Sequence, residues 1–269
     1  MILTVNHVSR YRYDLPVRSV VQSHRLTPSR HEGQRSLDWQ VRVSDGLSGG
    51  AYRDGAGDWV QAYSVPGPVS EISVEVVGRV EVTDMSGVLR GHRETIAPEA
   101  YLRATNATRA DVALADLAAS AGQGTDPLNR AHSLSAAVAD AIAYRPGATH
   151  AHTTAAEALE LGEGVCQDHA HALIAVARVA GMAARYVSGY LFSDAAGDPH
   201  EAAHAWAEVY VTGLGWVGFD PANRCCPDDR YIRLGSGFDA RDAAPIRGIA
   251  RGAGNESLDV TVAIGAAQQ

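Results

Sequence analysis

The amino-acid sequence predicts an α+β fold in which an antiparallel β-sandwich precedes a helical region and a second set of antiparallel strands. Short segments with alternating apolar residues occupy the first part of the chain. Helical periodicity begins at about residue 95, and strand-like aromatic and β-branched segments return after residue 203. A chain of 269 residues can hold one large domain or two closely packed ones. We expect a sandwich over residues 1–90, and the helices with the later strands over residues 91–269.

The first region is predicted to contain short strands. Alternation is clearest in residues 2–5, 36–43, 58–63 and 71–82. Gly and Pro cluster between these segments, at residues 45–57 and 66–68, as is typical of turns. Strands at this spacing favour an antiparallel sandwich. The histidines of this region are scattered, and we interpret them as structural or surface residues: His7, His24 and His31.

Helix start signals follow in the second region. Asp126 and Pro127 are typical of a helix N-terminus, because Asp accepts hydrogen bonds from free backbone N–H groups and Pro fits the first helical position. Thr154 and Glu157 have the spacing of a capping box. These residues predict a short helix that ends near Leu161.

A glycine loop leads into a helix that carries a candidate nucleophile. Gly162 and Gly164 predict the loop, and Gly181 stands where a glycine often follows a helix. Between them the apolar residues recur with helical periodicity. Cys166 therefore falls in the first turn, where free backbone N–H groups and the helix dipole favour the nucleophilic thiolate. The alternative is an inert buried cysteine, which is the commoner role of a free thiol.

A predicted hairpin supplies a base and its partner. Residues 204–211 and 215–221 alternate aromatic and β-branched residues around a Gly-containing connection. A thiolate nucleophile needs a base, and the base needs an orienting group. His204 and Asp220 share one side of the hairpin if its loop holds an odd number of residues or a bulge corrects the register. Together with Cys166 they would then form a Cys-His-Asp triad.

Three separated motifs resemble the transglutaminase-like core of the papain-like cysteine enzymes. They have the order and the helix–strand–strand placement of that family, and they span residues 164–168, 204–206 and 215–221. The opening of the chain, at residues 11–13 and 25–28, is similar to the N-terminal region of bacterial transglutaminase-like proteins. The tail fits the same group at residues 243–248 and 258–262. The resemblance covers nearly the whole chain. It implies a papain-like core, in which the cysteine helix packs on an antiparallel sheet.

Four further residues are candidates for the oxyanion site or the substrate cleft. Gln167 and the backbone N–H groups around Cys166 could stabilise a developing negative charge. The family resemblance implies a side-chain donor from upstream, for which Tyr144 is our candidate. Trp206 could form a wall of the cleft or pack in the core. His169 lies three residues after the cysteine, on the next turn of the same helix.

A zinc site is the competing interpretation of the histidines around Cys166. Six histidines surround that thiol in the sequence: His150, His152, His169, His171, His200 and His204. Their spacings match no zinc motif, and His171 should point away from Cys166 on the helix. The hairpin partners also explain His204 better than a metal does. We therefore predict neither a metal nor a cofactor.

Composition restricts the partners and the location. Net charge is −8, from 23 basic and 31 acidic residues, and disfavours nucleic acid as a partner. No apolar run approaches the roughly 20 residues of a membrane span. The first residues lack the pattern of a secretory signal, so we expect a cytoplasmic protein. Cys225 and Cys226 are adjacent, a poor geometry for a disulfide. Edges of the first sheet could pair copies into a homo-oligomer.

The sequence thus predicts a cysteine-dependent enzyme that acts on an amide or peptide bond through a thioester at Cys166. Hydrolysis, by a peptidase or amidase, is the first expectation, with a peptide or protein amide as substrate. The family resemblance also covers transfer of a glutamine acyl group to an amine. The third alternative is a non-catalytic binding module with a vestigial site.

Overall fold

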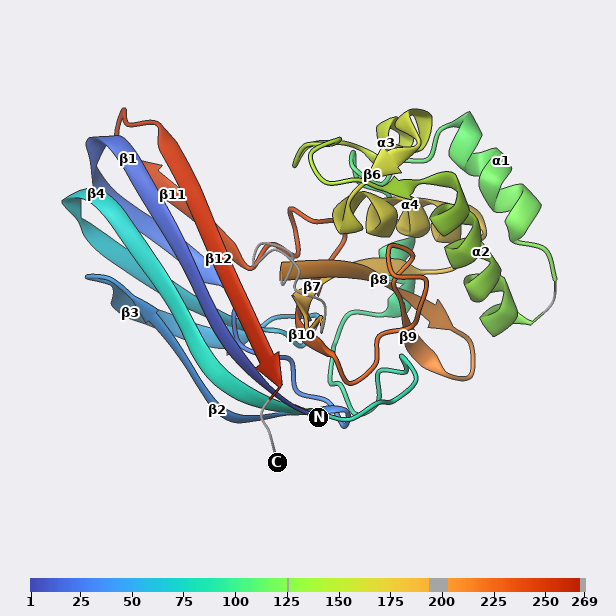
Figure 1. The fold of residues 1–269 in the computed structure, drawn as a ribbon, viewed down its shortest axis with the longest axis horizontal. Helices are drawn as coiled ribbons and strands as arrows, with labels where there is room; N and C mark the ends of the chain where they lie inside the picture. The colour runs from blue at the N-terminus through green and yellow to red at the C-terminus, as the bar shows by residue number, and fades with distance from the viewer. Residues whose placement is uncertain (125, 194–202, 267–269) are drawn as a thin grey trace.

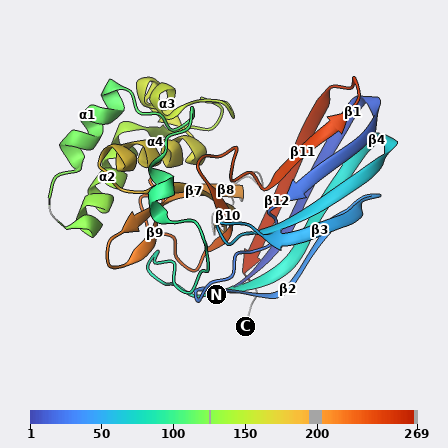
Figure 2. The same cartoon turned by 180° about the vertical axis from the view of Figure 1, so that it is seen from behind.

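The computed structural model describes residues 1–124, 126–193 and 203–266 and confirms the predicted α+β class. Figures 1 and 2 show a sheet of long strands at one side of the molecule, helices at the other, and a smaller sheet between them. The long-stranded sheet contains β1 (Ile2–His24), β2 (Gln34–Val43), β3 (Leu47–Arg53), β4 (Trp59–Val82), β11 (Ile246–Arg251) and β12 (Glu256–Ala266).

β1 and β4 run through this sheet and join its two halves. The first part of β1 pairs with β12 and its second part with β11, while β4 pairs with β3 and then with β2. Val20 and Val65 from one half share a buried core with Tyr11 and Val74 from the other. The predicted sandwich is therefore one hydrogen-bonded sheet whose two halves enclose a common interior.

The last two strands of the chain return to the first sheet. β11 and β12 pair with one edge of β1, where Leu3 lies opposite Ala266 and His24 lies opposite Ile246. The sequence prediction placed these C-terminal strands in the region of residues 91–269. In the structure they are hydrogen-bonded to the sheet of residues 1–90, because that edge of β1 offers backbone groups that need partners.

Capping residues define the helical layer as the sequence predicts. The side chain of Asp126 accepts from the backbone N–H of Asn129 at 2.8 Å, and Thr154 and Glu157 form the capping box. The layer comprises η1 (Pro98–Leu102), α1 (Val112–Ala121), α2 (Pro127–Ala141), α3 (Ala155–Leu161) and α4 (Cys166–Val179). α4 contacts α1, α2 and α3 and packs against the smaller sheet. It is almost entirely buried and forms the centre of the second region.

The smaller sheet carries the predicted hairpin. Its order is β10-β7-β8-β9, with β7 (Ala184–Leu191), β8 (Ala203–Val211), β9 (Gly215–Phe219) and β10 (Tyr231–Gly237). A further short pair joins β5 (Ala143–Tyr144) and β6 (Glu163–Gly164). Between β8 and β9 the loop holds residues 212–214, an odd number, and Ala207 pairs with Phe219. This register confirms the predicted condition for His204 and Asp220 to share one side.

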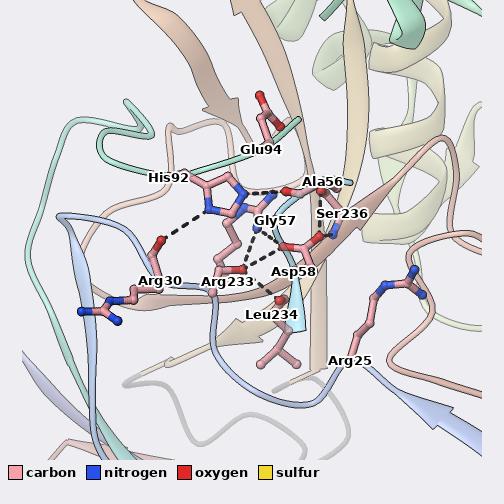
Figure 3. Close-up of polar contacts among 12 residues, drawn as sticks. Arg25, Arg30, Ala56, Gly57, Asp58, His92, Glu94, Arg233, Leu234 and Ser236 are labelled. Carbon is pink, nitrogen blue, oxygen red and sulfur yellow. Dashed lines mark hydrogen bonds and ion pairs between the residues drawn. The ribbon is translucent and has the colours of Figure 1, made fainter. Parts of the chain in front are cut away.

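A buried group of charged side chains joins the two sheets, and we call it the junction cluster: Asp58, Glu94, Arg185, Glu208 and Arg233. Arg233 Nη1 lies 2.8 Å from Asp58 Oδ1, and Arg233 Nε lies 2.8 Å from Glu208 Oε1. Figure 3 shows Arg233 beside Asp58, which also accepts from Ser236. Arg185 pairs with both Glu208 and Glu94. The cluster links the loop before β4 to three strands of the smaller sheet.

The carboxylates of this cluster are strongly stabilised in their charged form. Burial raises the pKa of Asp58 and of Glu208, but the neighbouring arginines outweigh that effect and hold both pKa values below their usual values of 3.8 and 4.5. Both residues therefore carry a full negative charge in the folded protein at neutral pH.

Candidate active site

Cys166 is the first residue of α4, as the sequence predicts. The preceding loop is fixed by Asp168, whose Oδ2 accepts from the backbone N–H of Val165 at 2.8 Å and from the hydroxyl of Thr149 at 2.5 Å. Asp168 thus caps the helix with its own side chain. The thiol is held at a helix N-terminus, where the backbone favours negative charge.

The structure brings Cys166, His204 and Asp220 together. His204 lies on β8, and its Nε2 is 2.6 Å from Asp220 Oδ2. Cys166 lies close enough to the imidazole to contribute to the raised pKa of His204. Because Asp220 occupies Nε2, the nitrogen left for the thiol is Nδ1. The ring therefore bonds to the carboxylate through Nε2 and leaves its opposite nitrogen for the candidate nucleophile.

The electrostatics of these groups favour charged forms. Burial lowers the pKa of His204, but the hydrogen bonds and charges of Asp220 and Cys166 outweigh it and raise that pKa to about 10. For Asp220, burial raises the pKa, and hydrogen bonds from His204, Asn223 and Tyr231 bring it below its usual value. At neutral pH the pair is an imidazolium beside a carboxylate.

Two polar neighbours of Asp220 were not predicted. Asn223 Nδ2 donates to Asp220 Oδ2 at 2.7 Å, and the hydroxyl of Tyr231 donates to the same oxygen at 2.9 Å. Asn223 follows the carboxylate by three residues in a turn, a spacing at which an Asp side chain often accepts from the backbone. Tyr231 begins β10, and nothing in the local sequence connects it with Asp220.

Aromatic packing fixes the imidazole plane. The ring of Trp206 lies nearly parallel to that of His204, with centroids 6.4 Å apart and planes 25° apart, and Tyr231 meets it at 63°. Trp206 is 3 % exposed and packs with Val187 and Tyr231 in a buried cluster. A Cβ on Gly189 would lie 2.6 Å from the Trp206 ring. The absence of a side chain there makes room for the indole.

The remaining sequence candidates surround the cysteine helix. Gln167 donates from Nε2 to the carbonyl of Ala151 at 3.3 Å, and Tyr144 is 45 % exposed. His169 is 2 % exposed, and both its ring nitrogens lie 2.9 Å from backbone carbonyl oxygens, those of Val165 and Ile142. His169 therefore braces α4 against the end of α2, which corrects its assignment to the substrate cleft.

The other two cysteines lie beside the site as free thiols. Cys225 Sγ is 3.3 Å from the hydroxyl of Tyr231. Burial raises the pKa of both thiols above the usual value, that of Cys226 to about 11. Both are therefore protonated at neutral pH, which disfavours rapid oxidation.

No metal-binding arrangement of three or more His, Cys, Asp or Glu side chains occurs within the part of the chain that the structure describes. His171 instead accepts a hydrogen bond from the backbone N–H of Ala240 at 3.0 Å, and burial lowers its pKa to about 4. His200, one of the six sequence candidates, lies outside the described residues.

Known proteins resemble this chain in both of its regions. The transglutaminase-like superfamily matches residues 115–221, and the bacterial transglutaminase-like N-terminal region matches residues 3–81. An uncharacterized protein of Mycobacterium leprae is 30 % identical over 280 residues, covering 97 % of this chain and 98 % of its own. One from Mycobacterium tuberculosis is 42 % identical over 129 residues, covering 44 % of this chain and 41 % of its own.

The fold has a crystallised counterpart. A "Putative Cysteine Protease" from Cytophaga hutchinsonii superposes with a TM-score of 0.76 at 22 % identity, covering 100 % of this chain and 91 % of that one. The long-stranded sheet and the α+β core thus recur together in that protein. From the family matches and the full-length relative we conclude that this chain belongs to the transglutaminase-like superfamily and begins with the bacterial transglutaminase-like N-terminal region.

Proposed function

We propose that this protein is a cysteine hydrolase that cleaves amide or peptide bonds through a thioester on Cys166. The observation that carries the proposal is the imidazole of His204, whose Nε2 lies 2.6 Å from Asp220 and whose pKa is raised by Asp220 and by the neighbouring Cys166 thiol. A nucleophile, a base and an orienting carboxylate in contact are the parts that acyl transfer requires.

The proposed reaction has two steps. The thiolate of Cys166 attacks the carbonyl carbon, the C–N bond breaks, and the imidazolium of His204 gives its Nδ1 proton to the departing nitrogen. Ammonia or an amine leaves, and a thioester remains. Neutral His204 then takes a proton from water, whose oxygen attacks the thioester and releases a carboxylic acid, which regenerates the thiolate–imidazolium pair.

Asp220 would keep the imidazole in the orientation that both steps need. It accepts from Nε2, so that Nδ1 faces the sulfur throughout. For the oxyanion we propose the backbone N–H of Cys166, at the helix N-terminus, assisted by the amide of Gln167. Tyr144 is the candidate side-chain donor from upstream.

Labelling of Cys166 by iodoacetamide across pH tests the proposal. The wild type and the His204→Ala variant are labelled, and the modified residue is mapped by mass spectrometry. We expect fast labelling of Cys166 at pH 6 that slows strongly in the variant, because an imidazolium beside the sulfur stabilises the thiolate that reacts. Cys225 serves as the internal control, since burial raises its pKa and it should label slowly in both proteins.

The outcome separates the candidate functions. An ordinary thiol profile at Cys166 that ignores His204 would refute the enzyme and leave the binding module. After a positive result, release of ammonia or new amino termini from peptides indicates hydrolysis. Incorporation of a fluorescent primary amine into a glutamine peptide would instead indicate acyl transfer.

The substrate, partners, location and oligomeric state of the enzyme stay predictions. We propose a peptide or protein amide as its partner, without nucleic acid or membrane, in keeping with the net charge of −8. Within the described residues no helix is long and apolar enough to cross a membrane. A cytoplasmic location and pairing into a homo-oligomer are likewise predictions from the sequence.

A further inference from the structure

We infer that Asn223 and Tyr231 are positioning residues of the triad, which clamp one oxygen of Asp220 and thereby aim the imidazole of His204 at Cys166. The inference rests on the proposed function, since it assigns a role within that site. Neither residue belongs to the triad, and they reach Asp220 from two separate elements, the turn after β9 and the first residue of β10.

The carboxylate of Asp220 has a full set of donors. Its Oδ2 accepts from His204 at 2.6 Å, from Asn223 at 2.7 Å and from Tyr231 at 2.9 Å. Oδ1 accepts from the backbone N–H of Asn223 at 3.3 Å. The residue is 0 % exposed, so water has little access to replace a lost donor. Each donor therefore stabilises the charged form of the carboxylate and holds the orientation of its side chain.

Tyr231 has one hydroxyl proton and two partners, so the direction of its hydrogen bonds is determined. The carboxylate of Asp220 only accepts, and Tyr231 must donate to it. The Cys225 thiol, 3.3 Å from the phenol oxygen, is then the donor to Tyr231. Burial and the charge of Asp220 raise the pKa of Tyr231 well above its usual value, so the phenol keeps the proton that it donates.

Asn223 is held in place by a tight turn. The backbone N–H of Asp220 donates to the carbonyl of Cys225 at 2.8 Å, closing the turn around Asn223. Arg224 has a positive φ of 54°, and its guanidinium bonds to the carbonyl of Ala139 at 2.7 Å at the end of α2. The turn that carries Asn223 is thus closed by a backbone hydrogen bond and anchored to the helical layer.

The clamp matters chemically because it sets how readily Asp220 takes up a proton. Donors to a carboxylate favour its charged form, and the pKa of Asp220 lies below its usual value for this reason. With one donor removed, Asp220 should protonate at a higher pH. His204 would then lose its acceptor at that pH, and the reactive pair with Cys166 would be lost at a less acidic pH.

The test compares Tyr231→Phe and Asn223→Ala with two matched controls away from the candidate active site. Tyr13 donates its hydroxyl to Glu256 at 3.0 Å, and Asn255 donates its amide to Asp14 at 2.8 Å, so Tyr13→Phe and Asn255→Ala remove the same kinds of bond elsewhere. Iodoacetamide labelling of Cys166 is measured from pH 3 to 8 on folded protein, as judged by circular dichroism.

We expect the acidic limb of the labelling profile to move up by about one pH unit in Tyr231→Phe and in Asn223→Ala, and to stay in place in both controls. A rate that falls equally at every pH would indicate a structural role and overturn the inference, as would profiles that superimpose on the wild type. If one variant fails to fold, the other decides. Failure of the proposed function is distinct, because the wild-type profile would then already be that of an ordinary thiol.

Discussion

Replacing Glu208 by glutamine should strongly destabilise the fold, because Glu208 is the shared acceptor of two buried arginines. Its carboxylate accepts from Arg185 Nε at 2.7 Å and from Arg233 at 2.8 and 3.3 Å. The side chains of Glu208 and Arg233 are each 4 % exposed and that of Arg185 is 0 % exposed. Glutamine has one acceptor oxygen, so its NH₂ group would face one of the two guanidinium groups.

The structure sets the size of this effect. Removing one partner of a buried ion pair costs about 3–5 kcal/mol, since the remaining charge stays buried without compensation. For a protein of this size that corresponds to a fall in melting temperature of roughly 6–20 °C. Glu81→Gln is the matched control, because Glu81 pairs with Arg35 at 2.7 Å while both side chains are exposed. There we expect a loss of about 0–1 kcal/mol.

Urea denaturation followed by circular dichroism measures both variants. The free energy of unfolding should be lower by at least about 2 kcal/mol in Glu208→Gln than in Glu81→Gln. The reasoning would be refuted if the two variants differed by less than about 1 kcal/mol, since the junction cluster would then contribute no more than a surface ion pair.

Three other predictions concern acid stability and two backbone positions. Asp58 and Glu208 have lowered pKa values in the folded protein, so the stability that they contribute is complete above about pH 4–5 and is lost as the pH falls further. The urea midpoint of the wild type should therefore drop between about pH 5 and pH 3. A midpoint that does not change over this range would contradict the prediction. Gly189→Ala should destabilise the site and slow the labelling of Cys166, because the new Cβ lies 2.6 Å from the Trp206 ring. Gly50→Ala is the control, since the space around Gly50 is open and labelling should stay unchanged. Equal labelling rates in the two variants would count against the packing argument. The free energy of unfolding, measured in urea, should be about 1 kcal/mol lower for Arg224→Ala than for Arg224→Gly. Both variants lose the guanidinium, but only glycine adopts the positive φ of this position without strain. Equal stability of the two variants would contradict the strain argument.

The site could be predicted where the information is local. Cys166 is placed by helix start and stop signals within twenty residues, and the relation of His204 to Asp220 follows from the number of residues in one loop. Both depend on the period of a helix or a strand, which the sequence displays directly. The hydrogen bond from Tyr231 to Asp220 does not depend on such a period, because Tyr231 lies on another strand and belongs to no sequence motif.

The fold was less predictable where distant segments pair. β1 and β4 are 23 and 24 residues long, yet Pro16 and the Pro-Gly-Pro segment at residues 66–68 resemble breaks between short strands. Charged residues such as Arg185 and Glu208 favour a solvent-facing interpretation of a strand, whereas here they meet partners brought in by other elements. Neither feature is visible until the tertiary contacts are known.

The pairing of β1 with β12 also determines the order in which the protein can be completed during synthesis. β1 is synthesised before the other strands of this sheet, and its outer edge pairs with residues 246–266, which emerge after all the others. Every candidate catalytic residue is translated while that edge is still unpaired, and an unpaired strand edge invites association with other chains. Synthesis of the β11–β12 segment, rather than completion of the cysteine core, is thus the event that closes the first sheet.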